Sequence, residues 1–215
     1  MIIDYVQARE RMVQEQLVSR GISDSRVLRA MAKVPRHLFL KSELWDHAYE
    51  DHPLPIGADQ TISQPYMVAL MAEALGVKGM ERVLEVGTGS GYLAAILSEL
   101  CAEVFSVEMV PVLALKARTL LNSLGYGNVS VLMGDGTLGW QEHSPYDAIV
   151  ISAAAPRIPR PLLEQLTVPG YLVFPMGEKE LQTLVRIRKD AQGIREEYLG
   201  ECHFVRLTGK YGWGN

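Results

Sequence analysis

From Arg82 onward, short aliphatic runs alternate with longer stretches that have helical spacing. The runs are continuous and do not alternate apolar with polar positions; they cover residues 83–86, 104–107, 129–132, 148–151 and 171–174. Strands that are buried on both faces of a parallel sheet have this pattern. Because strands and helices alternate along the chain, the pattern predicts an α/β fold with a mostly parallel sheet and helices on both faces.

The residues before this region have helical periodicity. Val13 and Leu17 share one face of a helix that we expect to stop at Gly21. A second helix is predicted between Ser23, as its cap, and Pro35. Its buried positions at 3.6-residue spacing are Val27, Met31 and Val34. The pattern therefore predicts an N-terminal helical extension that packs on the sheet.

A loop rich in proline and glycine is expected over residues 51–57, before the segment Thr-Ile-Ser-Gln-Pro at 61–65. An amphipathic helix then begins near Ser63 and closes at Gly76. Its apolar face consists of Val68, Met71, Ala72 and Leu75. A serine two residues before a proline at a helix start is typical of an N-cap, so the pattern alone favours a capping role for Ser63.

The last part of the chain contains two segments in which apolar and polar residues alternate. They cover residues 183–188 and 203–207, and a turn-rich stretch at 190–193 lies between them. Alternation of this kind indicates strands with one solvated face. We therefore expect a closing antiparallel pair.

The clearest ligand pattern is Glu-Val-Gly-Thr-Gly-Ser-Gly at 85–91, between a predicted strand and a helix that begins near Tyr92. A dinucleotide fingerprint has its third glycine one position later, so this spacing favours a nucleoside without a pyrophosphate. About twenty residues on, Glu108 ends the next strand, where an acidic side chain hydrogen-bonds ribose hydroxyls. Gly87, Gly89 and Glu108 are therefore predicted to bind a nucleoside.

Asp135 and Gly136 follow the third predicted strand, at the sheet edge where open α/β folds bind ligands. We expect Asp135 to reach the adenine amino group, although Asp-Gly is also a common turn dipeptide. Asp147 precedes the fourth strand and so lies at the opposite end of the sheet. It is therefore not predicted to belong to the site.

Composition and charge narrow the class of protein. The 215 residues are 48% hydrophobic, which is enough for one domain core, and the net charge of −4 has no basic stripe that would favour nucleic acid or anionic lipid. Cys101 and Cys202 lie far apart and no Cys/His ligand spacing occurs, so neither a disulfide framework nor a metal is predicted. A signal peptide and a span of ~20 apolar residues are also absent, which favours a cytoplasmic protein without a membrane partner.

Several segments resemble one enzyme family. The decapeptide from Val83 to Tyr92 is similar to motif I of protein-L-isoaspartate O-methyltransferases. Further segments similar to the family are 34–39, 53–57, 60–65, 134–136, 147–149, 153–156 and 169–170. Motif I is shared by many methyltransferases, whereas Thr61-Ile62-Ser63-x-Pro65 resembles only this branch. The resemblance covers residues 5–213 and implies a Rossmann-like S-adenosylmethionine-dependent methyltransferase fold.

The resemblance implies methyl transfer from S-adenosylmethionine to the free α-carboxylate of L-isoaspartyl residues in damaged peptides and proteins, and less efficiently to D-aspartyl. S-adenosylhomocysteine is the product. The ester then closes to a succinimide, and hydrolysis of this ring restores some aspartate. Because a carboxylate is already ionised near pH 7, no strong general base is required, and positioning of the reacting atoms supplies the catalysis. A monomer is the family expectation.

Site residues also follow from the resemblance. Ser63 is implied to be the catalytic serine, which orients the substrate carboxylate. The residues predicted or implied to bind the cofactor are Thr61, Glu85, Gly87, Thr88, Gly89, Glu108, Met109, Asp135 and Gly136. Those expected on the substrate side are Ile62, Tyr66 and Thr208. One departure is Asp59, where bacterial relatives commonly have glycine; its carboxylate either repels an anionic substrate or points to solvent.

We expect a single domain over residues 1–215. Its parts are an N-terminal helical extension with the active-site loop, a cofactor-binding sheet core, and C-terminal strands with a substrate-side segment, at 1–76, 77–180 and 181–215.

Three other functions remain open on the residues alone. A methyltransferase for another substrate would retain Gly87, Gly89 and Glu108 but would not explain the Thr-Ile-Ser-x-Pro element. A nicotinamide-dependent oxidoreductase would need the later third glycine. A non-catalytic S-adenosylmethionine-binding module would bind the cofactor without turnover.

Overall fold

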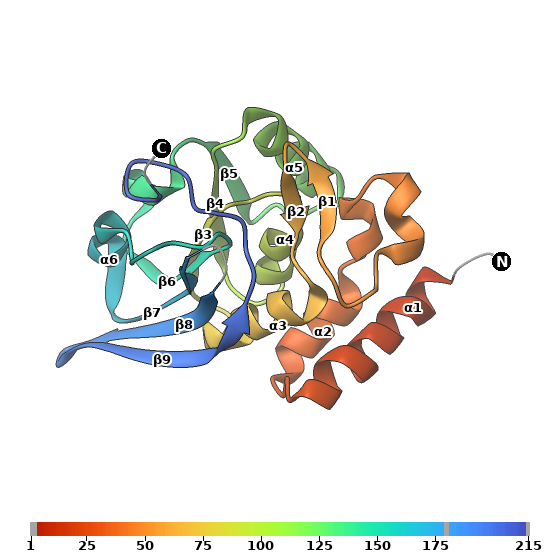
Figure 1. Cartoon of the computed structure of the whole chain (residues 1–215), viewed down its shortest axis with the longest axis horizontal. Coiled ribbons are helices and arrows are strands. Elements are labelled where there is room, and N and C mark those ends of the chain that lie inside the picture. The colour runs from red at the N-terminus through yellow and green to blue at the C-terminus, as the bar shows by residue number, and fades with distance from the viewer. Residues whose placement is uncertain (1–3, 179–180, 214–215) are drawn as a thin grey trace.

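The computed structural model describes residues 4–178 and 181–213. Its main sheet has the strand order β5-β4-β3-β6-β7-β8-β9 (Figure 1). The strands are β3 Arg82–Val86, β4 Glu103–Glu108, β5 Val129–Met133, β6 Tyr146–Ile151, β7 Leu166–Gly177, β8 Gln182–Asp190 and β9 Gly193–Cys202. Pairing is parallel from β5 to β7 and antiparallel from β7 to β9. The predicted fold class is therefore confirmed.

Helices cover both faces of this sheet. They are α1 Tyr5–Arg11, α2 Ser25–Lys33, α3 Pro65–Ala74, α4 Tyr92–Ser98, α5 Pro111–Ser123 and α6 Arg160–Gln165. A π-helical turn over Met12–Leu17 and a 3-10 turn over Val18–Arg20 continue α1. Further 3-10 turns cover Arg36–Phe39, Ser42–His47, Gly136–Leu138 and Gln141–His143. Within residues 4–178 and 181–213, no helix has the length and apolar composition of a membrane span.

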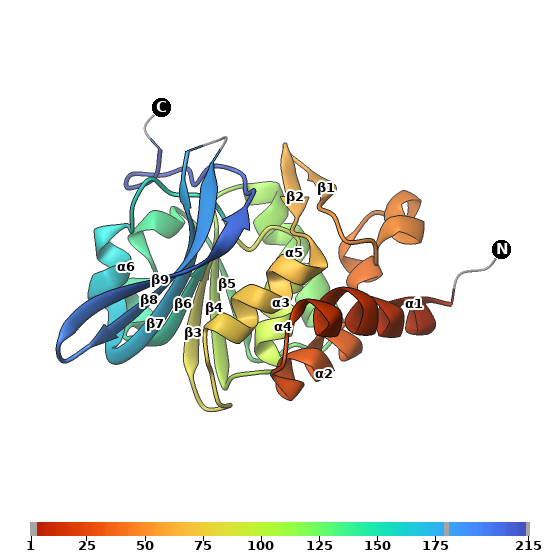
Figure 2. The same ribbon diagram turned by 60° about the horizontal axis from the view of Figure 1, so that its bottom comes forward.

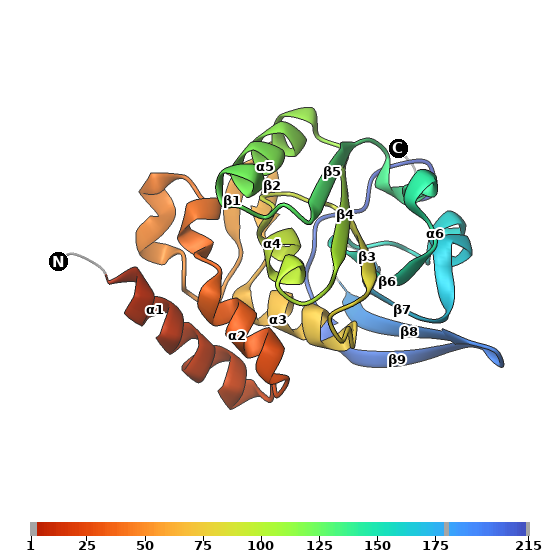
Figure 3. The same ribbon diagram turned by 180° about the vertical axis from the view of Figure 1, so that it is seen from behind.

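The sheet separates two hydrophobic clusters, because successive side chains of a strand point to opposite faces. Val83 and Val104 pack into the cluster that contains the residues of α2, α3 and α4, whereas Leu84 and Phe105 pack into the cluster with α6. Figure 2 shows α3 and α4 beside the sheet with α1 and α2 outside them, and α6 on the other side. The β8–β9 hairpin extends away from this body (Figure 3). Both faces of the central strands are therefore buried.

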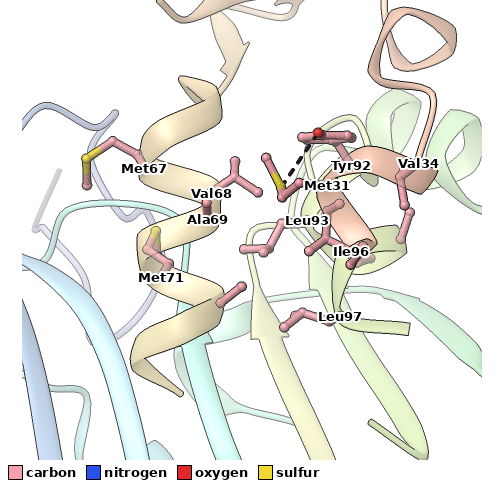
Figure 4. Packing of buried hydrophobic residues seen from close by; sticks show 14 of the residues in the cluster. Met31, Val34, Met67, Val68, Ala69, Met71, Tyr92, Leu93, Ile96 and Leu97 are labelled. Atoms are coloured by element: carbon pink, nitrogen blue, oxygen red, sulfur yellow. Dashed lines mark hydrogen bonds between the residues drawn. The ribbon is translucent and has the colours of Figure 1, made fainter. Parts of the chain in front are cut away.

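The helical cluster is packed around α4, which is apolar on all sides. Ile96 and Leu97 are completely buried, in the cluster to which Met31 of α2 and Val68 of α3 also belong (Figure 4). The Tyr92 hydroxyl donates to the sulfur of Met31 on α2 at 3.8 Å. A helix that is hydrophobic all round requires such cover, and the N-terminal extension provides it. The predicted buried positions Val27, Met31 and Val34 are confirmed.

Two predictions about helix caps are wrong. The cap of α2 is Asp24, whose carboxylate accepts from the backbone N–H of Arg26 at 2.8 Å, instead of Ser23. Ser23 donates its backbone N–H to Glu73 on α3. Helix α3 begins at Pro65 with Gln64 in the cap position and without a side-chain cap. Ser63 therefore does not cap this helix, and its hydroxyl is available for another role.

Two strand predictions also need correction. The stretch expected to be a loop at 51–57 contains β1 Leu54–Gly57, which pairs with β2 Gln60–Ile62 through a two-residue turn. The partner of β8 is β9, whereas residues 203–207 run beside the ends of the parallel strands, where Arg206 bridges to Ala154. Strand β9 is an exposed edge strand with polar residues on both faces, so it lacks the alternation by which strands are recognised.

Candidate active site

A cleft lies at the carboxyl ends of β3 and β4. The loop after β3, the end of β4, the start of the 3-10 turn at Gly136, the segment Thr61–Ser63 and the C-terminal segment 205–208 line it. In parallel α/β sheets, this edge is where ligands bind. We refer to it below as the cofactor cleft.

Glycine is required in this cleft for two different reasons. Gly87 has φ +93°, a left-handed conformation that L side chains rarely adopt. Gly136 has an ordinary φ, but a Cβ atom there would lie 2.5 Å from Cγ1 of Val86. The first glycine shapes the loop, and the second allows the chain after β5 to approach β3. Because neither glycine has a side chain, backbone atoms form the floor of the cleft at both positions.

The carboxylate of Glu108 is fixed at the end of β4. One oxygen accepts from the backbone N–H of Gly89 and the other from that of Val110, both at 2.8 Å. Each oxygen retains a lone pair for a further donor. The side chain lines the cleft, so it can accept from vicinal hydroxyls while it holds the glycine loop.

Glu85 is completely buried at the base of the same cleft. The hydroxyl of Ser106 donates to one carboxyl oxygen at 2.5 Å and is itself 2.5 Å from the hydroxyl of Thr88. The other oxygen, Oε1, has no partner within the described residues. Burial, opposed by the Ser106 hydrogen bond and assisted by the negative charge of nearby Glu108, raises the pKa of Glu85 to about 8. Glu85 is therefore mainly protonated at neutral pH.

A second cavity of about 670 Å³ adjoins the cofactor cleft. Its walls come from the first turns of α3, including Tyr66, from the end of β9 and from Arg20. Four residues line both cavities, and we call them the neck: Thr61, Ser63, Ser152 and Val205. Ser63 therefore lies at the junction of two cavities.

The structure brings most of the predicted site residues together. Those that line the cofactor cleft are Thr61, Ile62, Ser63, Glu85, Gly87, Thr88, Gly89, Glu108, Met109, Gly136 and Thr208. The hydroxyl of Thr208 donates to the sulfur of Met109 at 3.2 Å, which joins the C-terminal segment to the end of β4. Tyr66 lines the second cavity only, with the Arg20 guanidinium 3.5 Å from its ring centre.

Of the acidic residues singled out in the sequence, Asp59, Asp135 and Asp147 do not line either cavity. Asp135 accepts from the backbone N–H and hydroxyl of Thr137 at 2.9 and 2.7 Å, and from the backbone N–H of Lys210 at 2.8 Å. Its carboxylate thus anchors the C-terminal segment next to Gly136. Asp59 is exposed at the tip of the β1–β2 hairpin. Asp147, at the amino end of β6, accepts from the backbone N–H of Arg82 at 2.9 Å.

Sequence reasoning missed Ser152 and the C-terminal wall of the cleft. Ser152 directly follows β6, so the carboxyl-edge rule that was applied to Glu108 would have found it. Val205 and Leu207 carry no such signal, because they lie far from the glycine loop in the chain and reach it only through a crossing over the sheet edge.

Comparison with known proteins relates this site to one family. The family model described as protein-L-isoaspartate(D-aspartate) O-methyltransferase (PCMT) matches residues 7–212. A relative from Syntrophobacter fumaroxidans, protein-L-isoaspartate O-methyltransferase 1, is 53% identical over 212 residues, which is 99% of each chain. The chain belongs to this family.

Solved structures of the family have the same fold. A structure named protein-L-isoaspartate O-methyltransferase superposes with a TM-score of 0.87 at 32% identity, covering 95% of this chain and 67% of that one. A structure from Plasmodium falciparum, described as a beta-aspartate methyltransferase (PCMT) in complex with S-adenosyl-L-homocysteine, gives a TM-score of 0.79 at 26% identity and covers 93% and 98%. Both superpositions span nearly all of this chain.

Proposed function

We propose that this chain is an S-adenosylmethionine-dependent protein-L-isoaspartate O-methyltransferase. It methylates the free α-carboxylate of L-isoaspartyl residues in damaged proteins, and less efficiently the side-chain carboxylate of D-aspartyl residues. The observation that carries the proposal is the position of Ser63 at the neck between the cofactor cleft and a second cavity. At about 670 Å³, that cavity is in the range of ~300–1,000 Å³ that is typical of ligand pockets.

The residues of the cleft fit S-adenosylmethionine. Glu108 offers its free lone pairs to the ribose hydroxyls, and Gly87 and Gly89 admit the ligand close to the backbone. The unpaired Oε1 of buried Glu85 lacks the hydrogen-bond partner that buried polar atoms normally have, and a bound polar group would supply one. Thr61, Thr88, Met109 and Gly136 complete the proposed cofactor site, with Asp135 behind it. When bound, the cofactor supplies an electrophilic methyl group on a sulfonium centre.

The neck is suited to a carboxylate acceptor. Its side chains carry hydroxyl or apolar groups and no ionisable group. The free α-carboxylate of an isoaspartyl residue is ionised at neutral pH without the help of a base. The Ser63 hydroxyl donates to one carboxylate oxygen and so directs the other toward the methyl group. Ile62 and Tyr66 shape the substrate side, and Thr208 closes the cleft. Alignment of this kind contributes on the order of 7 kcal/mol or more to a reaction barrier.

The test uses two synthetic peptides that differ only in isoaspartyl or aspartyl at one position. We expect base-labile methyl ester, from radiolabelled S-adenosylmethionine, on the isoaspartyl peptide alone. Ser63→Ala should lower the rate, whereas the matched control Ser123→Ala, a surface serine at the end of α5, should not. A protein that binds the cofactor but labels neither peptide would exclude the proposed substrate.

We further propose a cytoplasmic monomer that acts as one domain over residues 1–215, divided at 1–76, 77–180 and 181–215. Support for a reducing compartment comes from Cys101 and Cys202, which are both free and buried. A single family model that extends over residues 7–212 supports one domain. The net charge of −4 supports a protein without a nucleic-acid partner.

A further inference from the structure

Two of the neck residues are serines that come from different parts of the fold. Ser63 belongs to the segment between β2 and α3, and Ser152 follows β6. Both are half-buried and line both cavities. Within residues 4–178 and 181–213, neither hydroxyl is hydrogen-bonded to a protein group. Any ligand that extends from one cavity to the other therefore passes two free hydroxyl donors.

Ser152 is held firmly beside the glycine loop. Its backbone N–H donates to the carbonyl of Val86 at 2.8 Å, which continues the pairing of β3 with β6 beyond the last strand residue. Its Cβ lies 3.6 Å from the place where a Cβ on Gly87 would be. The hydroxyl is thus carried on rigid backbone next to the cofactor cleft, as a positioned donor requires.

The proposed reaction has a use for a second donor. A carboxylate has two oxygens with about four lone-pair sites, and one hydroxyl donates a single hydrogen bond. While one oxygen approaches the methyl carbon, the other retains negative charge in a partly buried site. A charged oxygen that is removed from water without enough donors is strongly destabilised. Ser63 alone donates only one hydrogen bond to this oxygen, which has lone pairs for more than one.

We propose that Ser152 is a second substrate-binding residue, whose hydroxyl donates to the methyl-accepting carboxylate together with that of Ser63. The inference rests on the proposed function. During transfer, the carboxylate oxygen forms the new bond to the methyl carbon while the bond between sulfur and this carbon breaks, and the sulfur keeps the electron pair. The cationic sulfonium and the anionic carboxylate become a neutral thioether and a neutral ester. Neither serine gives up its proton.

The first experiment compares Ser152→Ala with Ser152→Thr, which keeps a hydroxyl, and with the control Ser123→Ala. Loss of a hydrogen bond to a charged group predicts that Ser152→Ala lowers kcat/KM for an isoaspartyl peptide about 10- to 100-fold. Ser152→Thr should remain within about 5-fold of the wild type. The Kd for S-adenosylhomocysteine and the unfolding temperature should change little in each variant, because no described protein group loses a partner.

The second experiment measures binding instead of activity. An isoaspartyl peptide and its α-carboxamide analogue are titrated into the protein saturated with S-adenosylhomocysteine, by calorimetry. Wild-type protein should prefer the carboxylate, and Ser152→Ala should lose about 10-fold or more of this preference. Unchanged kcat/KM and unchanged preference in Ser152→Ala would overturn the role of Ser152 while the proposed function stands. A wild-type protein that binds S-adenosylhomocysteine but does not methylate the isoaspartyl peptide would overturn the proposed function itself.

Discussion

Replacing Glu85 with glutamine should remove a pH dependence from the stability of the ligand-free protein. The pKa of this buried carboxyl is about 8 in the folded chain, compared with an ordinary value of 4.5 when unfolded. Between these values the native state keeps a proton that the unfolded chain has lost. The free energy of unfolding therefore falls as pH rises through this window, by up to about 1.4 kcal/mol per pH unit. Below pH 4.5 the effect is absent, and above pH 8 it is complete.

The loss between pH 6 and pH 8 should be roughly 2 kcal/mol, because the slope flattens as the pH approaches the folded pKa. Glutamine has nearly the same shape, accepts the same bond from Ser106, and does not ionise. The difference in the free energy of unfolding between Glu85→Gln and the wild type should therefore grow by this amount across the window, in favour of the variant.

The assay is urea unfolding of wild type, Glu85→Gln and the exposed control Glu142→Gln at half-unit steps from pH 5.5 to 8.5. Histidines and other groups titrate in the same way in all three proteins, so the difference isolates Glu85. The reasoning would be refuted if the difference in the free energy of unfolding between Glu85→Gln and the wild type stayed constant within about 0.5 kcal/mol from pH 6 to pH 8. Burial would then not shift the pKa of this carboxyl as described.

Two further predictions concern the cleft and the hairpin beside it. In Glu108→Gln, the amide keeps an acceptor for only one of the two backbone N–H donors and places its NH2 group against the other. We expect calorimetry to give at least a 10-fold weaker Kd for S-adenosylhomocysteine, and a Kd within 2-fold of the wild type would contradict the role of this carboxylate. Ala58 and Asp59 both have positive φ, 51° and 55°, in a two-residue turn that favours Asn-Gly. Ala58→Asn with Asp59→Gly should raise stability by about 1 kcal/mol and the Tm by about 2–4 °C in thermal unfolding, and a lower Tm would contradict this account of the turn.

The parallel sheet was predictable because its strands are buried on both faces and have continuous aliphatic runs. Strand β9 was not predictable in this way, because it is an edge strand with both faces in water, and Glu196 and Glu197 occupy successive positions on it. Local sequence therefore contains no periodic signal there, and only pairing with β8 defines the strand. Asp24 was missed as a cap for a similar reason: three adjacent residues, Ser23, Asp24 and Ser25, all have capping side chains, and tertiary contact with Glu73 decides among them.

The glycine loop and Glu108 were predictable because strand ends and turn residues define them locally. The family resemblance supplied Thr61 and Ser63, whereas the residue pattern alone favoured a helix cap for Ser63. The neck as a whole could not be predicted, because Ser152 and Val205 join it only when the sheet is assembled. For the same reason the sequence showed Asp135 at the correct edge, but not that its carboxylate is engaged by the backbone of Lys210.

The anchoring of the C-terminal segment has a practical consequence for work with this enzyme. Residues 208–213 are held at the sheet edge by hydrogen bonds. The Trp213 indole donates to the carbonyl of Ala154 at 2.8 Å, and the backbone N–H of Lys210 donates to Asp135. A purification tag or fluorescent fusion after this segment would disturb the hydrogen bonds that hold it against the cofactor cleft. At the other terminus, α1 begins on the far side of the molecule (Figure 1). Labels, surface tethers and fusion partners therefore belong at the N-terminus.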